Sequence, residues 1–244
     1  MRILAIDTTE GASIALLEGE TPVAERTMPS VRHHVEDLGP ALREIVRNLP
    51  GTANANAPHI DYAVVGVGPA TYTGLRAGIA IGLGFALGRG IPIGGVLSHH
   101  GVYCADHGAY CGEVPATGVN HIVVTDARRK ELFWTHYAGL TTAGIPQPVA
   151  GPFVTSAEDL REYVQQQEAT GTQLRYIGSG RCLYPEVLGV TSGAQEGEKN
   201  IATWLGVIAH RMMQAGDELL PAHPIYLREP DAQVPRQMTP VSRI

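Results

Sequence analysis

The sequence predicts an α/β fold that is built twice, as two similar halves of one chain. Each half contains a buried apolar strand that ends at an acid, Asp7 in the first half and Asp126 in the second. Each half also contains a strand residue followed by the pattern Gly-x-Gly-x-x-x-Tyr, at residues 65–72 and at residues 177–184. Either feature alone is common, but two features in the same order indicate an internal duplication.

The overall composition is that of an ordinary soluble globular protein. The chain has 244 residues, of which 44% are hydrophobic, enough for one large domain or for two small domains that share a core. The formal net charge is −6, and only Lys130 and Lys199 are lysines, so the sequence lacks the basic stripe of a protein that holds nucleic acid unaided. Three cysteines without a disulfide-framework spacing, and no signal-peptide pattern, lead us to expect a cytoplasmic protein with no membrane segment.

The first half opens with three short strands. Apolar runs at residues 3–6, 13–17 and 23–28 are separated by tight turns, which predicts a three-stranded meander. Apolar residues at three- and four-residue spacings over residues 31–49 then predict an amphipathic helix. We place its regular part after Pro40, because proline disrupts a helix interior.

Asp7, Thr8 and Thr9 lie at the tip of the first predicted strand. An acid and two hydroxyls at a strand edge are suited to a phosphate or to a magnesium-bound phosphate. The alternative is that these side chains satisfy the amides of their own turn, as Asp and Thr commonly do. The residues alone leave both interpretations open.

Residues 66–90 are the most locally specified stretch of the chain. A strand at residues 63–65 ends at two glycines and a proline, and a long apolar helix follows. Three glycines inside this helix lower its intrinsic stability by roughly 3 kcal/mol, because each interior glycine costs about 1 kcal/mol relative to alanine. They recur at every fourth residue and form a side-chain-poor face, which another helix of this chain or of a second protein could approach closely. This face consists of Gly74, Gly78, Gly82 and Ala86.

Four residues of zinc-ligand type share one face of the helix predicted after the strand at residues 91–96. Residues 100 and 111 of a straight helix are about 16 Å apart, at roughly 1.5 Å rise per residue, which is too far for one tetrahedral ion. We therefore expect buried thiols and capping histidines, with at most an adjacent pair binding a metal. The four residues are His100, Cys104, His107 and Cys111.

The second half repeats the pattern of the first. Strands are predicted at residues 122–125, 131–134 and 149–155, and a helix begins at Ser156 with acids in its first turn. A last apolar helix is predicted at residues 201–214.

These elements divide the chain into two predicted subdomains. The first comprises residues 1–98 and is completed by the helix at 201–215, and the second comprises residues 99–200. Residues 229–244, with their prolines and scattered polar residues, are expected to form a flexible tail.

Two such halves are typical of the actin-like ATPase (ASKHA, ribonuclease H-like) architecture, in which phosphates lie between the halves. Within it, the chain resembles the TsaB family of bacterial tRNA threonylcarbamoyladenosine (t6A) biosynthesis proteins. The resemblance rests on ILAIDTT, GVGPATYTGLRAGIAIGLGFALG, TDARRKELFW and PIYLR, in this order across almost the whole chain. Residues 70–72 depart modestly from the family pattern and leave residues 73–76 intact.

The resemblance implies a non-catalytic scaffold and activating subunit. Such a chain is expected to pair with a TsaD-like catalytic paralogue and to work with a TsaE-like ATPase. The complex transfers a threonylcarbamoyl group to N6 of adenosine 37 in tRNAs that read codons starting with A. This chain is expected to bind tRNA only as part of the complex. ATP and a divalent metal are expected in the partner subunits, with no cofactor in this chain. A weak homodimer is compatible with this reading.

The resemblance also implies why this chain would lack activity. The catalytic paralogue holds a metal with a histidine pair at positions that match Ser98 and Val102, and neither residue suits that role. Thr8 and Thr9 stand where a phosphate loop has glycine, so nucleotide binding in this chain is not expected. What remains of a phosphate loop is Asp7, Thr8, Thr9 and Asp126.

The family further implies a helix bundle between this chain and its partner. The glycine-rich face would then receive a foreign helix, and Gly78→Leu would abolish association while leaving the fold intact. Arg76 lies at a helix start, where the dipole disfavours a cation unless an acid pairs with it, either on the partner or in this chain as Asp7 or Asp61. The implied interface consists of Leu38, Leu42, Ile45, Thr73, Gly74, Arg76, Ala77, Gly78, Ile81, Gly82 and Phe85.

An alternative from a different class is a free-standing enzyme, either an actin-like small-molecule kinase or a peptidase-like hydrolase. A kinase needs an acid that acts as base and an intact phosphate loop, and a peptidase needs a nucleophile with a base or a metal. Cys104 and Cys182 are candidate nucleophiles for which the sequence provides no partner.

Overall fold

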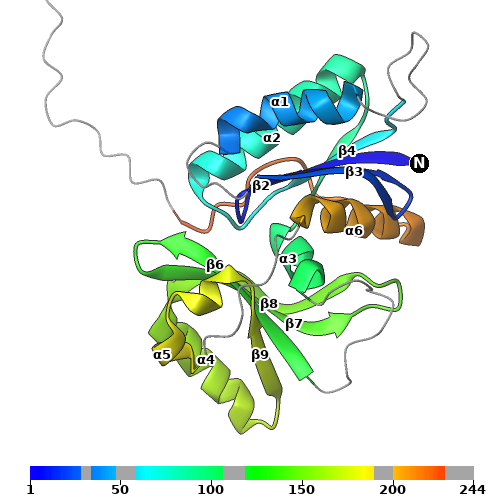
Figure 1. The fold of residues 1–244 in the computed structure, drawn as a ribbon. Helices are drawn as coiled ribbons and strands as arrows, with labels where there is room; N and C mark the ends of the chain where they lie inside the picture. Colours follow the sequence, from blue (N-terminus) through cyan, green and yellow to red (C-terminus); the bar gives the residue numbers. More distant parts are fainter. Residues whose placement is uncertain (29–33, 48–58, 107–118, 190–199, 229–244) are drawn as a thin grey trace, which may run out of the picture.

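The computed structural model describes residues 1–28, 34–47, 59–106, 119–189 and 200–228. They form two β-sheets with helices packed on both, one sheet in each half of the molecule (Figure 1). One apolar core cluster contains residues from both halves, including Ile3 of the first sheet and Val123 of the second. The two halves are therefore joined by a shared core.

The first sheet has five strands in the order β3-β2-β1-β4-β5. The central strand β1 pairs antiparallel with β2 and parallel with β4. Its side chains are buried on both faces, which is why this segment of the sequence is a continuous apolar run. The strands are β1 (Arg2–Asp7), β2 (Ala12–Glu18), β3 (Thr21–Met28), β4 (Tyr62–Gly66) and β5 (Ile93–Val96).

The second sheet repeats this arrangement with four strands in the order β8-β7-β6-β9. Its central strand β6 again pairs antiparallel with the next strand and parallel with the strand that follows a helix. Because the order matches β3-β2-β1-β4, the duplication predicted from the sequence is confirmed. The strands are β6 (Val119–Arg128), β7 (Glu131–Leu140), β8 (Pro146–Ser156) and β9 (Gln173–Ile177).

Helices cover both faces of the first sheet. In Figure 1, α1 (His34–Arg47) and α2 (Tyr72–Arg89) lie side by side on one face, and α6 (Ile201–Ala215) lies on the other. A Cβ on Gly206 of α6 would lie 2.3 Å from Cδ1 of Leu17, so the helix backbone is in close contact with the sheet. Helix α3 (Ser98–Asp106) lies between the two halves.

The helices of the second half are shorter. Helix α4 (Ala157–Ala169) connects β8 to β9 and begins as predicted, because the Ser156 hydroxyl accepts a hydrogen bond from the Asp159 amide. After β9 there is no counterpart of the long α2 among the described residues. A short 3-10 helix, η1 (Ser179–Cys182), and α5 (Pro185–Leu188) follow instead.

One sequence-based expectation about the helices needs correction, and others fall outside the described residues. Helix α1 begins before Pro40 and contains it, so the proline does not mark the start of the regular part. The described part of α3 ends at Asp106, and His107, Cys111 and the tail at residues 229–244 lie outside the described residues. Among the residues that the structure describes, no helix is both long and apolar enough to cross a bilayer.

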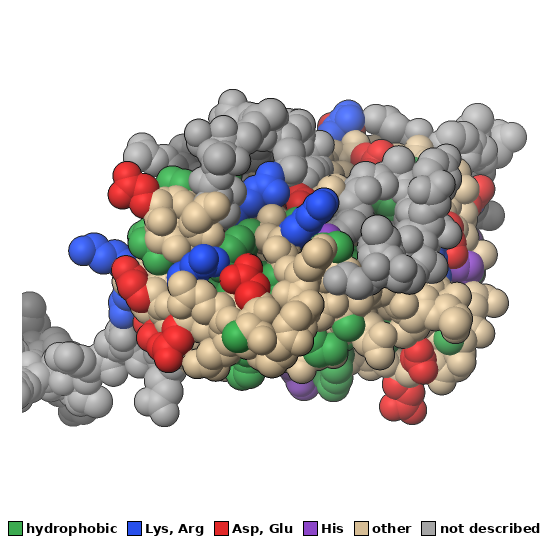
Figure 2. Space-filling model, turned by 90° about the horizontal axis from the view of Figure 1, so that it is seen from below, with side chains coloured by type: hydrophobic (Ala, Val, Ile, Leu, Met, Phe, Trp, Pro, Cys, Tyr) green, Lys and Arg blue, Asp and Glu red, His purple; other side chains and the backbone are tan. Residues whose placement is uncertain are grey.

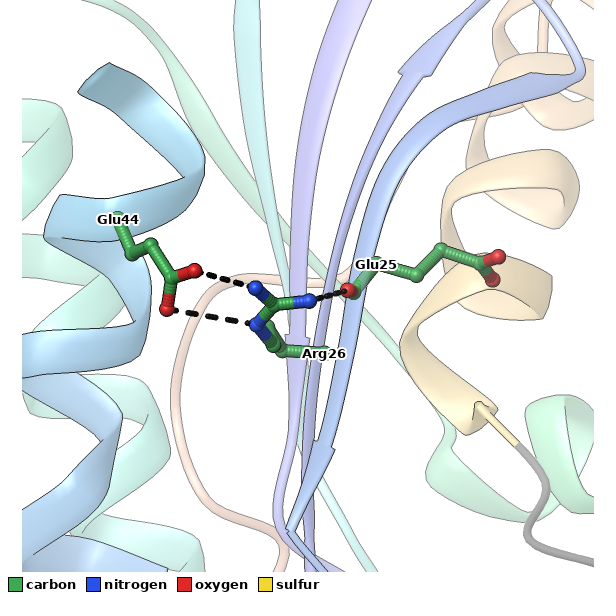
Figure 3. Close-up of polar contacts among 3 residues, drawn as sticks. All are labelled: Glu25, Arg26 and Glu44. Carbon is green, nitrogen blue, oxygen red and sulfur yellow. Dashed lines mark hydrogen bonds and ion pairs between the residues drawn. The ribbon is translucent and has the colours of Figure 1, made fainter. Parts of the chain in front are cut away.

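A surface ion pair connects α1 to the edge of the first sheet. Arg26 of β3 donates to both carboxylate oxygens of Glu44 on α1 and to the backbone oxygen of Glu25 (Figure 3). Both partners are about half exposed, so this pair is expected to orient α1 more than to stabilise the fold.

Candidate functional site

The first candidate site is the tip of β1, where Asp7 lies buried between the halves. Its carboxylate accepts hydrogen bonds from the Thr9 amide at 2.8 Å and from the Ser98 hydroxyl at 2.6 Å. Burial raises the pKa of the Asp7 carboxyl above its usual range, and these hydrogen bonds oppose that shift in part. The donors that face Asp7 thus come from its own turn and from the first residue of α3.

The two Gly-x-Gly loops allow the backbone to approach these strand tips closely. A Cβ on Gly66 would lie 2.0 Å from the Asp7 carboxylate, and a Cβ on Gly178 would lie 2.4 Å from the backbone oxygen of Val124 on β6. Both loops therefore require glycine for the same reason, which is contact with the end of the central strand of their own sheet.

Thr8 is engaged within the first half. Its hydroxyl donates to the backbone oxygen of Gly74 at 2.9 Å, and its side chain is almost completely buried. It thus connects the tip of β1 to the first turn of α2. The Asp7–Thr9 hydrogen bond is the one that the turn-capping interpretation predicts, whereas Thr8 bonds outside its own turn.

Glu10 of the first half contacts the glycine loop of the second half. Its carboxylate accepts a hydrogen bond from the backbone amide of Ser179 at 2.9 Å, in the glycine loop of the second half. Burial raises the pKa of Glu10, and the nearby carboxylates of Asp7 and Asp106 add to the shift. No sequence pattern marks Glu10, because a Glu in a turn carries no signal of a long-range contact.

Asp126 at the tip of β6 also bonds to its own turn. Its carboxylate accepts from the Arg128 amide at 2.6 Å and forms an ion pair with the Arg128 guanidinium at 2.8 Å. By strand pairing the counterpart of Asp7 in the second half is Val124, because Ile6 pairs with Val65 just before Gly66 and Val123 pairs with Ile177 just before Gly178. Asp126 lies two residues farther along β6, so the expected match between the two acids is wrong.

The buried face of α3 carries His100, one of the four residues of zinc-ligand type, and its neighbour His99. His99 lies between the hydroxyls of Thr135 at 2.8 Å and Thr125 at 2.9 Å, and His100 bonds to the Tyr137 hydroxyl at 2.7 Å. Burial lowers the pKa of His99 to about 3 and that of His100 to about 4, so both are neutral at pH 7.

These contacts assign α3 a structural role. Cys104 lies in the shared core, and Val102, one of the positions that match the histidine pair of the catalytic paralogue, is also buried there. Within the described residues, no group of three or more metal-ligating side chains is placed to hold an ion.

The second candidate site is helix α2, whose glycine face points inward. Gly74, Gly78 and Gly82 are buried. A Cβ on Gly78 would lie 2.8 Å from the Thr8 hydroxyl, and a Cβ on Gly82 would lie 2.3 Å from Cγ1 of Val65. The prediction that a foreign helix packs on this face is therefore wrong, because the first sheet of the chain itself already occupies it.

The implied interface residues on α1 are also buried. Leu38, Leu42 and Ile45 belong to the core cluster between α1 and the first sheet. They are not available to a partner in this structure. The remaining implied interface residues lie on α2: Thr73 and Arg76 are exposed, and Ala77, Ile81 and Phe85 are half-buried.

The outer face of α2 is nevertheless free of charge over most of its length. Leu87 on this face is 81% exposed, and a Cβ on Gly84 or Gly88 would meet no atom within 4 Å. Because α2 is apolar on nearly every side, its outer face exposes small and apolar residues to solvent. We define the outer face of α2 as Thr73, Ala77, Ala80, Gly84, Leu87 and Gly88.

Among the residues that the structure describes, Arg76 pairs with aromatic side chains and not with an acid. Its guanidinium lies 3.7 Å from the ring centre of Tyr72 and donates to the Tyr226 hydroxyl, while Tyr72 and Tyr226 stack on each other. The suggested internal pairs with Asp7 and Asp61 are therefore wrong.

Tyr226 belongs to a C-terminal segment that crosses from one half to the other. This segment pairs with β5 at Leu220 and with the backbone of Val67 at Ile225, at 2.9 Å. It then reaches the second half, where Arg228 forms an ion pair with Glu131 at the start of β7. Figure 1 shows this segment between α2 and the tip of the second sheet.

Comparisons with known proteins agree with this arrangement. The family model described as "TsaD: tRNA N6-adenosine threonylcarbamoyltransferase" matches residues 27–173. A solved structure from Pseudomonas aeruginosa, described as an uncharacterized protein with similarity to peptidase YEAZ, superposes with a TM-score of 0.69 at 24% identity. The superposition covers 93% of this chain and 99% of that one, so the two share a fold.

The sequence comparison is more specific. The chain is 32% identical over 235 residues to the Escherichia coli tRNA threonylcarbamoyladenosine biosynthesis protein TsaB, covering 93% of this chain and 95% of that protein. It is also 29% identical to an uncharacterized protein of Mycobacterium tuberculosis, covering 95% and 93% of the two chains. With its duplicated α/β fold and this similarity over almost its whole length, the chain belongs to the TsaB family.

Proposed function

We propose that this chain is a non-catalytic scaffold and activating subunit of the complex that makes t6A in tRNA. In this proposal it pairs with a TsaD-like catalytic subunit, and a TsaE-like ATPase acts with them in the cytoplasm. The complex transfers a threonylcarbamoyl group to N6 of adenosine 37 in tRNAs that read codons starting with A. Membership in a family named for t6A biosynthesis supports the pathway.

The observation that carries the docking role is the outer face of α2. A helix that is apolar on every side is normally covered on every side, and here one side is exposed. Its small residues Ala80 and Gly84 would let the backbone of a partner helix approach closely, and Leu87 would supply apolar contact. The interface is therefore proposed on this outer face, about half a helical turn from the glycines that the sequence suggested.

The non-catalytic role is supported by the tips of the strands. The position that matches the first metal-binding histidine of the catalytic paralogue holds Ser98, which donates its hydroxyl to Asp7. The second matching position is the buried Val102. Neither side chain is a suitable metal ligand in this setting.

The junction between the strand tips of the two halves is also poorly suited to a nucleotide. The Glu10 carboxyl group already accepts the hydrogen bond of the Ser179 amide in the glycine loop, so this amide is not available to a phosphate. In the proposed complex, ATP and a divalent metal would be bound by the partner subunits. Titration of the isolated chain with ATP and Mg²⁺ by calorimetry is expected to give no heat of binding, whereas micromolar binding would favour the alternative of a free-standing kinase.

The docking role is tested by co-elution with a TsaD-like catalytic protein. Leu87→Glu is expected to weaken the complex by roughly 10- to 100-fold, because loss of a buried leucine contact costs about 1.5–3 kcal/mol. Leu183→Glu is the matched control, since Leu183 is 47% exposed in the second half, away from α2.

The proposal requires that Leu87→Glu weakens co-elution with the catalytic protein and that Leu183→Glu does not. Equal co-elution of the Leu87 and Leu183 variants would contradict docking through α2. Self-association of the free chain, measured by analytical ultracentrifugation, would show whether the same face also supports the weak homodimer.

A further inference from the structure

An arginine near the start of α2 belongs to an aromatic cluster. The Arg76 guanidinium lies 3.7 Å from the ring centre of Tyr72 and 5.3 Å from that of Tyr226. The two rings stack with their centres 5.1 Å apart, although Tyr226 lies 150 positions from Arg76 in the sequence. The backbone amide of Ile225 donates to the Val67 oxygen at 2.9 Å and thereby fixes the segment that carries Tyr226. We define the Arg76 cluster as Tyr72, Arg76 and Tyr226.

The charge of Arg76 has no acidic partner among the described residues. Its Nε donates to the Tyr226 hydroxyl, and no described residue accepts a hydrogen bond from its terminal nitrogens, Nη1 and Nη2. The first turn of α2 contains no acid, and the helix dipole disfavours a cation near this end. Because Arg76 is exposed, these two nitrogens present a planar fork that matches a carboxylate in shape and charge.

The Arg76 cluster is continuous with the outer face of α2. Ala80 lies one helical turn after Arg76, and Leu87 lies two turns after Ala80, so all three are on the same side of the helix. Tyr72 and Tyr226 are each 42% exposed. Tyrosine and arginine are enriched among the residues that dominate the energy of protein interfaces, and a side chain already held by its neighbours loses little entropy on binding. The cluster therefore suits the charged end of an otherwise apolar protein interface.

We propose that the terminal nitrogens of Arg76 bind the carboxylate of an Asp or Glu side chain on the TsaD-like partner when this partner docks on the outer face of α2. The inference rests on the proposed function and adds to it the residue that selects the partner. Small and apolar residues make up most of the outer face, so this face offers contact area but little specificity. A charge pair fixes the register of a docked helix and disfavours a partner that lacks the acid.

A phosphate group of tRNA is the other anion that this fork could bind, but the surroundings favour a protein carboxylate. A surface for the nucleic-acid backbone needs several basic groups together. Arg89 is the other basic residue of α2 and lies at its opposite end, and Arg228, two residues after Tyr226, is paired with Glu131. On the face shown in Figure 2, which is the lower face of Figure 1, basic side chains are interspersed with acidic ones.

The test compares the affinities of variants of this chain for the TsaD-like partner, measured by calorimetry at low and at high salt. Arg76→Gln is expected to weaken the complex about 10- to 100-fold, because the partner's carboxylate loses its charged hydrogen bonds. The affinity of this variant should also fall less with added salt than that of the wild type, because the ion pair is gone. Arg175→Gln removes an exposed charge from β9 in the second half and is the control, with an affinity within about twofold of the wild type.

Charge reversal separates binding from a structural role of Arg76. Arg76→Glu should bind more weakly than Arg76→Gln, and replacing one acidic residue of the partner by lysine should restore binding to Arg76→Glu. The acidic surface residues of the partner are replaced one at a time. A change in the partner cannot repair the fold of this chain, so restored binding assigns the effect to a contact between the two proteins. If no replacement restores binding, the inference is overturned.

The outcomes distinguish this inference from the proposed function. If the wild-type chain does not bind the catalytic partner, the proposed function fails. If Leu87→Glu weakens the complex and Arg76→Gln binds like the wild type, only the role of Arg76 is overturned. Loss of tRNA binding by a complex that contains Arg76→Gln and assembles with wild-type affinity would also overturn it, because this result would assign Arg76 to a phosphate.

Discussion

Adding one methyl group to each of two glycines of α2 is expected to have opposite effects on stability. Gly82→Ala places a Cβ 2.3 Å from Cγ1 of Val65 and 3.4 Å from Cδ1 of Ile93. Val65 is a buried, β-branched residue of β4 and has little freedom to move away. Gly84→Ala, only two residues along the helix, places its Cβ in open space.

The magnitudes follow from two terms. Both substitutions gain about 1 kcal/mol from helix propensity. Overpacking at Gly82 costs about 3 kcal/mol, at the upper end of the range for such insertions, because the clash is with a stiff core side chain. We therefore expect a net loss of about 2 kcal/mol for Gly82→Ala and a gain of about 1 kcal/mol for Gly84→Ala.

Urea unfolding of the isolated chain, followed by far-UV circular dichroism, measures both free energies. In thermal melts the two variants should differ by roughly 6–12 °C, at about 2–4 °C per kcal/mol for a chain of this size. Gly78→Leu is also expected to destabilise the fold, because even a Cβ at that position would lie 2.8 Å from the Thr8 hydroxyl. Changes of the same sign for Gly82→Ala and Gly84→Ala would refute the orientation of α2.

Two more predictions concern the junction between the halves. His99 and His100 are neutral in the folded state, with pKa values of about 3 and about 4, but take up protons when unfolded below pH 6.5. The free energy of unfolding should therefore fall by about 4 kcal/mol for the pair as the pH drops from 7 to 5, and the raised pKa of Asp7 opposes part of this loss. Urea unfolding at both pH values measures the loss. A loss below about 1 kcal/mol would contradict the assignment of both histidines as neutral in the folded state. Tyr226→Ala should lower the free energy of unfolding by about 1–2 kcal/mol through loss of the stack and of the cation–π contact with Arg76. Tyr226→Phe keeps the ring and should retain most of this stability in thermal melts. Equal losses of stability for the two variants would argue against the stack.

Much of the fold could be predicted from local patterns. The predicted strands of both sheets are present, and the cap at Ser156 is confirmed, because these features depend on residues close together in the sequence. The match between Asp7 and Asp126 could not be predicted correctly, because β6 continues to Arg128 and the strand register makes Val124 the counterpart of Asp7. Glu10 bonds to Ser179 across 169 positions, and no local pattern marks such a contact.

The sequence by itself determined the duplicated α/β halves, the glycine loops at the strand tips and the family resemblance. Only the tertiary structure decided which face of α2 is buried. The helix is apolar on nearly every side and carries glycines on two faces, Gly74, Gly78 and Gly82 on one and Gly84 and Gly88 on the other. Periodicity cannot distinguish two such faces, because neither is polar; contact with Thr8 and Val65 selects the inner one and leaves the other exposed.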